Sequence, residues 1–91
     1  MKPTIEKVVQ EYVISVVGLE FSVKARISEF ITGSNSNGFH WSVSHHYSGT
    51  ENGHPYIPSV RILPTLEEAE FLLMAYIENF TPFSVVPDEF Y

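Results

Sequence analysis

The segment PTLEEAEFLLMAYIENF, residues 64–80, limits the possible folds of this chain more than any other feature. Thr65 followed three residues later by Glu68 is the capping-box pattern that begins a helix, and Pro82 requires the helix to end before it. Because successive helical residues are about 100° apart, the apolar residues fall on one broad face. That face comprises Leu66, Ala69, Leu72, Leu73, Tyr76, Ile77 and Phe80. A helix with so wide an apolar face must pack against a second layer.

The second layer is predicted by apolar residues that recur at every other position before this helix. Residues 21–28 alternate in this way, which is typical of a half-buried strand, and a change of phase at Glu29-Phe30 predicts a bulge. The stretch FHWSVSHHY, residues 39–47, predicts a second strand. Residues 56–62 predict a third strand, which Pro58 places at a sheet edge.

The N-terminal segment carries apolar residues at helical spacing. Their positions predict a helix over residues 3–17: Ile5, Val8, Val9, Tyr12, Val13 and Val16. Residues 12–17 are rich in β-branched side chains, so the sequence leaves open whether this half is helix or strand. The expected fold is α+β in the order αβββα, a three-stranded antiparallel meander with both helices on one face. We expect a single domain over residues 1–91, with residues 81–91 an aromatic tail that packs back on it.

The composition restricts the class of partner. Eleven acidic residues against five Lys and Arg give a formal net charge of −6, which disfavours nucleic-acid backbones and anionic membranes and permits a basic protein partner. The longest apolar runs are too short to span a membrane, and the N-terminus lacks the pattern of a signal peptide. With no cysteine in the chain, these features predict a cytoplasmic protein.

The histidines raise the question of a metal site. On a strand, His45 would face the core, whereas His40 and His46 would face solvent about 20 Å apart, too far to bind one metal ion. Only His46, His54 and Glu51 could converge, as the site of a small metal-dependent enzyme, and coordination geometry disfavours this hypothesis. No catalytic motif is present either, so we expect a non-enzymatic protein without cofactor or metal.

The C-terminal helix suggests a binding surface. Phe71 and Met74 fall outside its apolar face, among Glu67, Glu70 and Glu78. Apolar side chains rimmed by acids are typical of a partner-binding surface, and a second copy of this chain could also bind there. The alternative, which the sequence leaves open, is that the N-terminal segment or the tail covers the pair.

The open face of the predicted sheet is an alternative surface. It carries Lys24, Arg26, His40, His46 and Arg61, which could bind an acidic partner or a nucleic acid. It lacks exposed aromatic residues on which bases could stack, so an ordinary solvated face is the preferred interpretation.

The αβββα order, with a last helix that begins TLEEAE, resembles the layout of double-stranded-RNA-binding domains. Those domains place phosphate-binding lysines at the start of this helix, where the present chain has Glu67, Glu68 and Glu70. The layout is also similar to HicB-type antitoxins and to small acidic phage anti-CRISPR proteins, which cover a working surface of a nuclease complex. This resemblance implies a non-enzymatic inhibitor or regulator of phage or mobile-element origin that covers a basic surface of a nuclease or a similar target.

Overall fold

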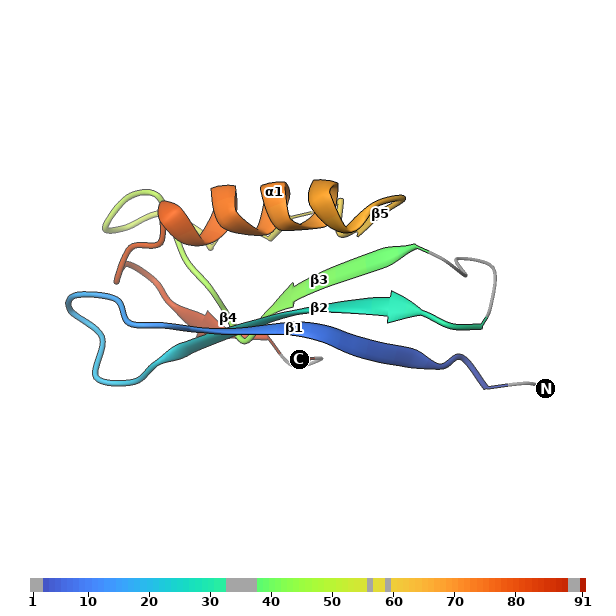
Figure 1. Ribbon diagram of the computed structural model, residues 1–91. Coiled ribbons are helices and arrows are strands. Elements are labelled where there is room, and N and C mark those ends of the chain that lie inside the picture. The colour runs from blue at the N-terminus through green and yellow to red at the C-terminus, as the bar shows by residue number, and fades with distance from the viewer. Residues whose placement is uncertain (1–2, 33–37, 56, 59, 89–90) are drawn as a thin grey trace.

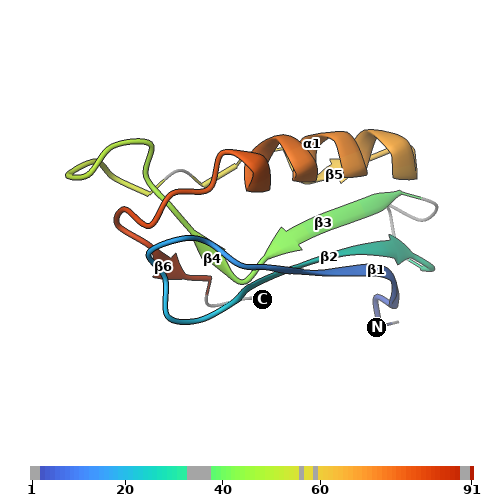
Figure 2. The ribbon, with the colours of Figure 1, turned by 60° about the vertical axis from the view of Figure 1, so that its left-hand side comes forward.

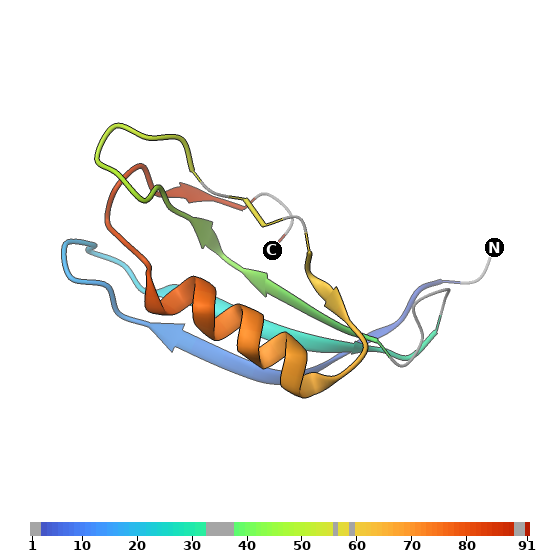
Figure 3. The same cartoon turned by 90° about the horizontal axis from the view of Figure 1, so that it is seen from above.

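The computed structural model describes residues 3–32, 38–55, 57–58, 60–88 and 91. A four-stranded antiparallel sheet is covered on one face by the helix α1 (Leu66–Glu78), so the fold is α+β (Figure 1). The strand order is β1-β2-β3-β5. The bounds are β1 (Glu6–Ile14), β2 (Val23–Phe30), β3 (Phe39–Val43) and β5 (Ile62–Leu63). Seen from above, α1 lies over the sheet, roughly along its strands (Figure 3).

The predicted N-terminal helix is wrong, because residues 6–14 form the edge strand β1. This strand pairs with β2 along its whole length, and the register shifts between Val8 and Gln10. The shift makes Val9 an extra, bulged residue, so that Val9 and Tyr12 both reach the core although they are three positions apart. The bulge therefore explains why the apolar spacing of a strand imitates that of a helix. The β-branched composition of residues 12–17 indicated a strand there, and this is right for residues 12–14 alone, since β1 begins at Glu6 and ends at Ile14.

The bulge predicted at Glu29-Phe30 is also wrong, since β2 pairs with β3 in an unbroken register from Ala25 to Glu29. The change of phase has another cause. Phe30 is buried on the sheet face opposite α1, where its ring stacks on His40 with the ring centroids 5.9 Å apart. Both faces of this sheet are therefore covered in part.

The predicted strand over residues 39–47 is divided by a bend at Ser44. Its backbone N–H donates to the Lys24 carbonyl at 2.7 Å, and its Oγ accepts from the Lys24 N–H at 2.8 Å, so the bend is tied to β2. After the bend, β4 (His45–His46) pairs with β6 (Val86–Pro87) of the C-terminal tail in a small second sheet (Figure 2). Of the predicted strand over residues 56–62, only Ile62 joins the ladder, while Tyr56 and Ser59 lie outside the described residues.

The core lies between α1 and the sheet. Ala69, Leu73 and Tyr76 of α1 are buried, which confirms the predicted apolar face. They pack against a buried group from the sheet and the segment after it: Ala25, Ile27, Trp41, Val43 and Tyr47. Thr65 caps the helix by accepting from the Glu68 N–H at 3.2 Å, as the capping-box pattern predicts. Within the described residues, no helix is long and apolar enough to cross a membrane.

Candidate functional site

A cleft of about 710 Å³, lined by both polar and apolar side chains, lies on the sheet face opposite α1. Three parts of the chain line this sheet cleft. The sheet and β4 contribute Glu6, Val8, Arg26, Ser28, His40, Ser42 and His46, the segment before β5 contributes Ile57 and Arg61, and the tail contributes Val86, Pro87 and Asp88. Its volume lies within the range of about 300–1,000 Å³ that is usual for small-molecule pockets.

Two buried serines from neighbouring strands lie among the residues that line the cleft. In the β2–β3 register Arg26 is opposite Ser42, and Ser28 is opposite His40, so the four side chains form a compact group. Ser28 is 5% exposed and Ser42 8% exposed. Neither hydroxyl forms a side-chain hydrogen bond with another described residue. The fully buried side-chain atom without a partner in the described ranges is Trp41 Nε1, so the two serine oxygens keep some access to the cleft.

One end of the cleft is closed by a charged cluster centred on Asp88. Asp88 Oδ2 lies 2.9 Å from His46 Nε2 and 3.4 Å from Arg61 Nη1. The other ring nitrogen of His46, Nδ1, lies 3.0 Å from the hydroxyl of Tyr76. The side chains of His46 and Asp88 are only 4% and 8% exposed. This cluster joins the tail to the sheet and to the helix.

Arg26 has a different environment from Arg61. Its guanidinium carbon lies 4.3 Å from the centre of the Tyr91 ring, a cation–π contact, and Arg26 forms no ion pair with any residue in the described ranges. Burial raises the pKa of Tyr91, Arg26 opposes that rise, and Glu11 adds to it. His40 also lines the cleft, and its Nδ1 lies 3.2 Å from Glu6 Oε1, a partly exposed contact that contributes little to stability.

The cleft brings together four of the five residues predicted for the sheet face, namely Arg26, His40, His46 and Arg61. Lys24 is exposed and lies outside the lining. Because Arg61 is paired with Asp88 and His40 with Glu6, the face offers no continuous basic strip for a nucleic-acid backbone.

His46 was expected at the solvent face, and this expectation is wrong, since the residue is 3% exposed. The bend at Ser44 changes the direction of the chain, and β6 then pairs with β4 in a second sheet. His45 is half-buried, and its ring packs against Phe21 with the ring centroids 4.7 Å apart. Burial, and next the neighbouring His46, lower the pKa of His45.

Sequence reasoning missed Asp88 as a member of this site, whereas the strand alternation already predicts Ser28 and Ser42 on the same sheet face as Arg26. Asp88 is the only aspartate of the chain, which was the one available signal. Its pairing with His46 spans 42 positions and depends on how the tail packs, so no local pattern predicts it.

The hypothetical metal site at His46, His54 and Glu51 is not assembled. Both ring nitrogens of His46 lie within hydrogen-bond distance of protein atoms, and His54 and Glu51 are exposed. No group of three or more His, Asp or Glu among the described residues is placed to hold a metal ion.

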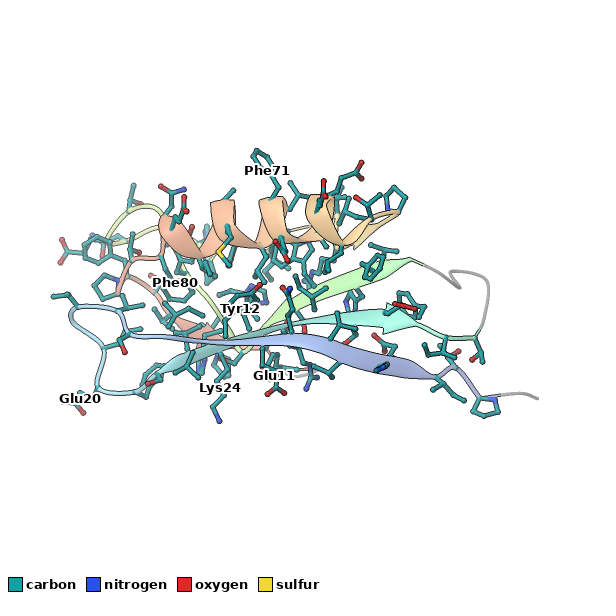
Figure 4. All side chains as sticks on the ribbon, viewed as in Figure 1. Glu11, Tyr12, Glu20, Lys24, Phe71 and Phe80 are labelled. Carbon is teal, nitrogen blue, oxygen red and sulfur yellow. The ribbon has the colours of Figure 1, made fainter. Side chains whose placement is uncertain are left out.

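The second candidate surface is the outward face of α1, which we call the helix surface. It consists of Glu67, Glu68, Phe71, Ala75 and Glu78, all exposed. Phe71 is 73% exposed and points away from the sheet (Figure 4). Beside it lies a shallow groove of about 330 Å³, to which Leu63 and Leu72 contribute.

The other two residues predicted for this surface lie at its margin. Met74 and Glu70 are half-buried, so they are less available than Phe71. Glu70 lies near Tyr12 of β1: burial raises the pKa of Tyr12, and the Glu70 carboxylate adds to the rise. The described part of the chain therefore leaves Phe71 uncovered and partly covers Met74.

No protein-family model, curated protein or solved structure matches this chain. The αβββα order that carried the resemblance described above is also not the observed order, because β1 takes the place of the first helix. Function must therefore be inferred from the surfaces themselves.

Proposed function

We propose that this chain is a non-enzymatic protein-binding module whose helix surface docks on a basic surface of a partner protein. The observation that carries the proposal is the 73% exposure of Phe71 at the centre of an acidic helix face.

The exposed Phe71 ring supports docking because a partner that buries it would remove a large apolar surface from water. Fully burying a phenylalanine side chain stabilises an association by about 1.5–3 kcal/mol, and aromatic residues are enriched among those that dominate binding energy. Leu63 and Leu72 extend the apolar area beside the ring. Contiguous exposed apolar areas with a polar rim are typical of protein–protein contact sites.

The charge of the helix supports a basic partner. α1 carries four glutamates and no basic residue, and Glu67, Glu68 and Glu78 are exposed around Phe71. The formal net charge of −6 adds long-range attraction to a positively charged surface. An inhibitor of a nuclease complex, which covers a nucleic-acid-binding surface, is one such module. That more specific role, a phage or mobile-element origin and a cytoplasmic location remain part of the proposal.

Affinity capture with matched variants tests this function. Tagged wild type, Phe71→Ala and Val17→Ala are incubated with lysate of the source organism or its host, and retained proteins are identified by mass spectrometry. Val17 is the control because it is 95% exposed and lies outside α1. We expect wild type and the Val17 variant to retain one stoichiometric basic protein that the Phe71 variant loses, with binding weakened by salt.

A fold control accompanies the capture. The urea midpoint of Phe71→Ala should equal that of wild type, because a mostly exposed side chain adds little to stability. Retention of the same partner by Phe71→Ala, or unfolding of this variant, would refute the docking role of Phe71. Self-association that the variant abolishes would instead identify a second copy of the chain as the occupant.

A further inference from the structure

The sheet cleft, on the face opposite the helix surface, has the chemistry of a separate small-molecule site. We propose that it binds a small organic anion, with one carboxylate or phosphate group on an apolar body. The inference depends on the cleft alone and not on the partner proposed for α1.

The anionic group would lie at Arg26. Its guanidinium lies over the Tyr91 ring in a cation–π contact, and its N–H donors have no carboxylate partner among the described residues. A planar guanidinium with free donors suits carboxylates and phosphates, which accept two parallel hydrogen bonds. The nearest acid on the neighbouring strand, Glu11, is opposite Arg26 in the register but does not line the cleft.

The two serine hydroxyls are the second, independent observation. Ser28 and Ser42 are more than nine-tenths buried, line the cleft, and form no side-chain hydrogen bond within the described part of the chain. Ser42 is directly opposite Arg26 in the β2–β3 register. Neither oxygen is a fully buried atom without a partner, so both hydroxyls keep access to the cleft, and an acceptor that enters it would gain these donors together with Arg26.

The remaining charges favour a single anionic group. The charges of Arg61 and Asp88 offset each other, and Asp88 also contacts His46. Arg61 is therefore already paired with a carboxylate and is less available to an anionic ligand. His40 is next to Glu6 at the rim. Arg26 is thus the strong anion-binding group that has no acidic partner among the described lining residues.

The apolar lining defines the rest of the ligand. Val8, Ile57, Val86 and Pro87 come from three separate segments and line the same cleft. A ring or short alkyl chain attached to the anionic group would contact them. Inorganic phosphate lacks this part and should bind more weakly.

Nuclear magnetic resonance titrations of the ¹⁵N-labelled full chain test the site. The probes are benzoate, phenyl phosphate, inorganic phosphate and neutral benzyl alcohol. We expect saturable shifts of the Ser28, His40 and Ser42 amide signals with benzoate or phenyl phosphate, and weaker binding of the other two. Absence of saturable shifts with both aromatic anions would overturn the proposal, as would equal affinity for benzyl alcohol. Affinity for inorganic phosphate equal to that for the aromatic anions would overturn the proposal that the ligand has an apolar body.

Two variants with the same change of charge locate the binding group. Arg26→Gln should weaken binding by about tenfold or more, as the loss of a charge-assisted contact implies. Lys24→Gln should not, because Lys24 is on the same strand and exposed but outside the cleft. Equal losses in both variants would show a general charge effect and refute the site. If Arg26→Gln changes the whole spectrum, Ser42→Ala is used in its place. A loss of affinity smaller than that expected for Arg26→Gln supports the site, and unchanged affinity overturns the role of the serines.

Discussion

Asp88 provides a direct test of how the C-terminal tail is held on the sheet. Asp88→Asn preserves the shape of the side chain and removes its charge. The contact with His46 is nearly dry, so its charge-assisted hydrogen bond should contribute about 1.5–3 kcal/mol. The contact with Arg61 is longer, 3.4 Å, and the Arg61 side chain is 24% exposed, so we expect it to add less than about 1 kcal/mol. The free energy of unfolding should therefore fall by roughly 2–3 kcal/mol.

Urea unfolding followed by the fluorescence of the single tryptophan, Trp41, measures this loss. For a domain of this size the same change should lower Tm by roughly 10–20 °C. Glu20→Gln is the matched control, since Glu20 is an exposed carboxylate between β1 and β2 (Figure 4) and its loss changes the net charge equally. If the stabilities of the two variants differ by less than about 0.5 kcal/mol, the Asp88 cluster does not hold the tail and the reasoning is refuted.

Two further predictions concern His45 and Thr65. The pKa of His45 is lowered in the folded protein, so folding favours the neutral imidazole. The resulting contribution to the free energy of unfolding is fully present above the ordinary pKa of about 6.5, and it is lost as the pH falls from there toward the lower folded pKa. His45→Gln should therefore lose less stability than wild type between about pH 7 and 5, measured by paired urea titrations, and parallel losses would contradict this. Thr65→Ala should lower the free energy of unfolding by about 1 kcal/mol, because the Glu68 N–H loses its acceptor. Thr65→Ser keeps a hydroxyl acceptor and should retain most of the wild-type stability. Equal thermal midpoints for wild type and the alanine variant would exclude a capping role.

The helix surface and the sheet cleft lie on opposite faces of the sheet, so the two proposals can fail separately. Phe71→Ala leaves the cleft lining unchanged, and Arg26→Gln leaves α1 unchanged. Testing each variant in both assays would also show whether a ligand in the cleft affects partner binding.

Local sequence patterns were sufficient to predict those features that depend on residues within a single helix or strand. The cap at Thr65 and the apolar spacing of residues 66–80 determined where α1 begins and which side it buries, because both depend on residues within one or two turns. The alternation in β2 likewise placed Arg26 on the face opposite the core. Arg61 and His40, predicted on the same face, do line the cleft with it.

Tertiary structure decided what depends on partners distant in the sequence. Residues 6–14 become a strand because β2 offers an edge to pair with, and the bulge at Val9 brings Val9 and Tyr12 to the core in spite of their helical spacing. His46 is buried only because a bend and the tail meet there, 42 positions before Asp88. The sequence alone thus determined the helix and the outward position of Phe71 on it, whereas the cleft exists only when three separate segments are packed together.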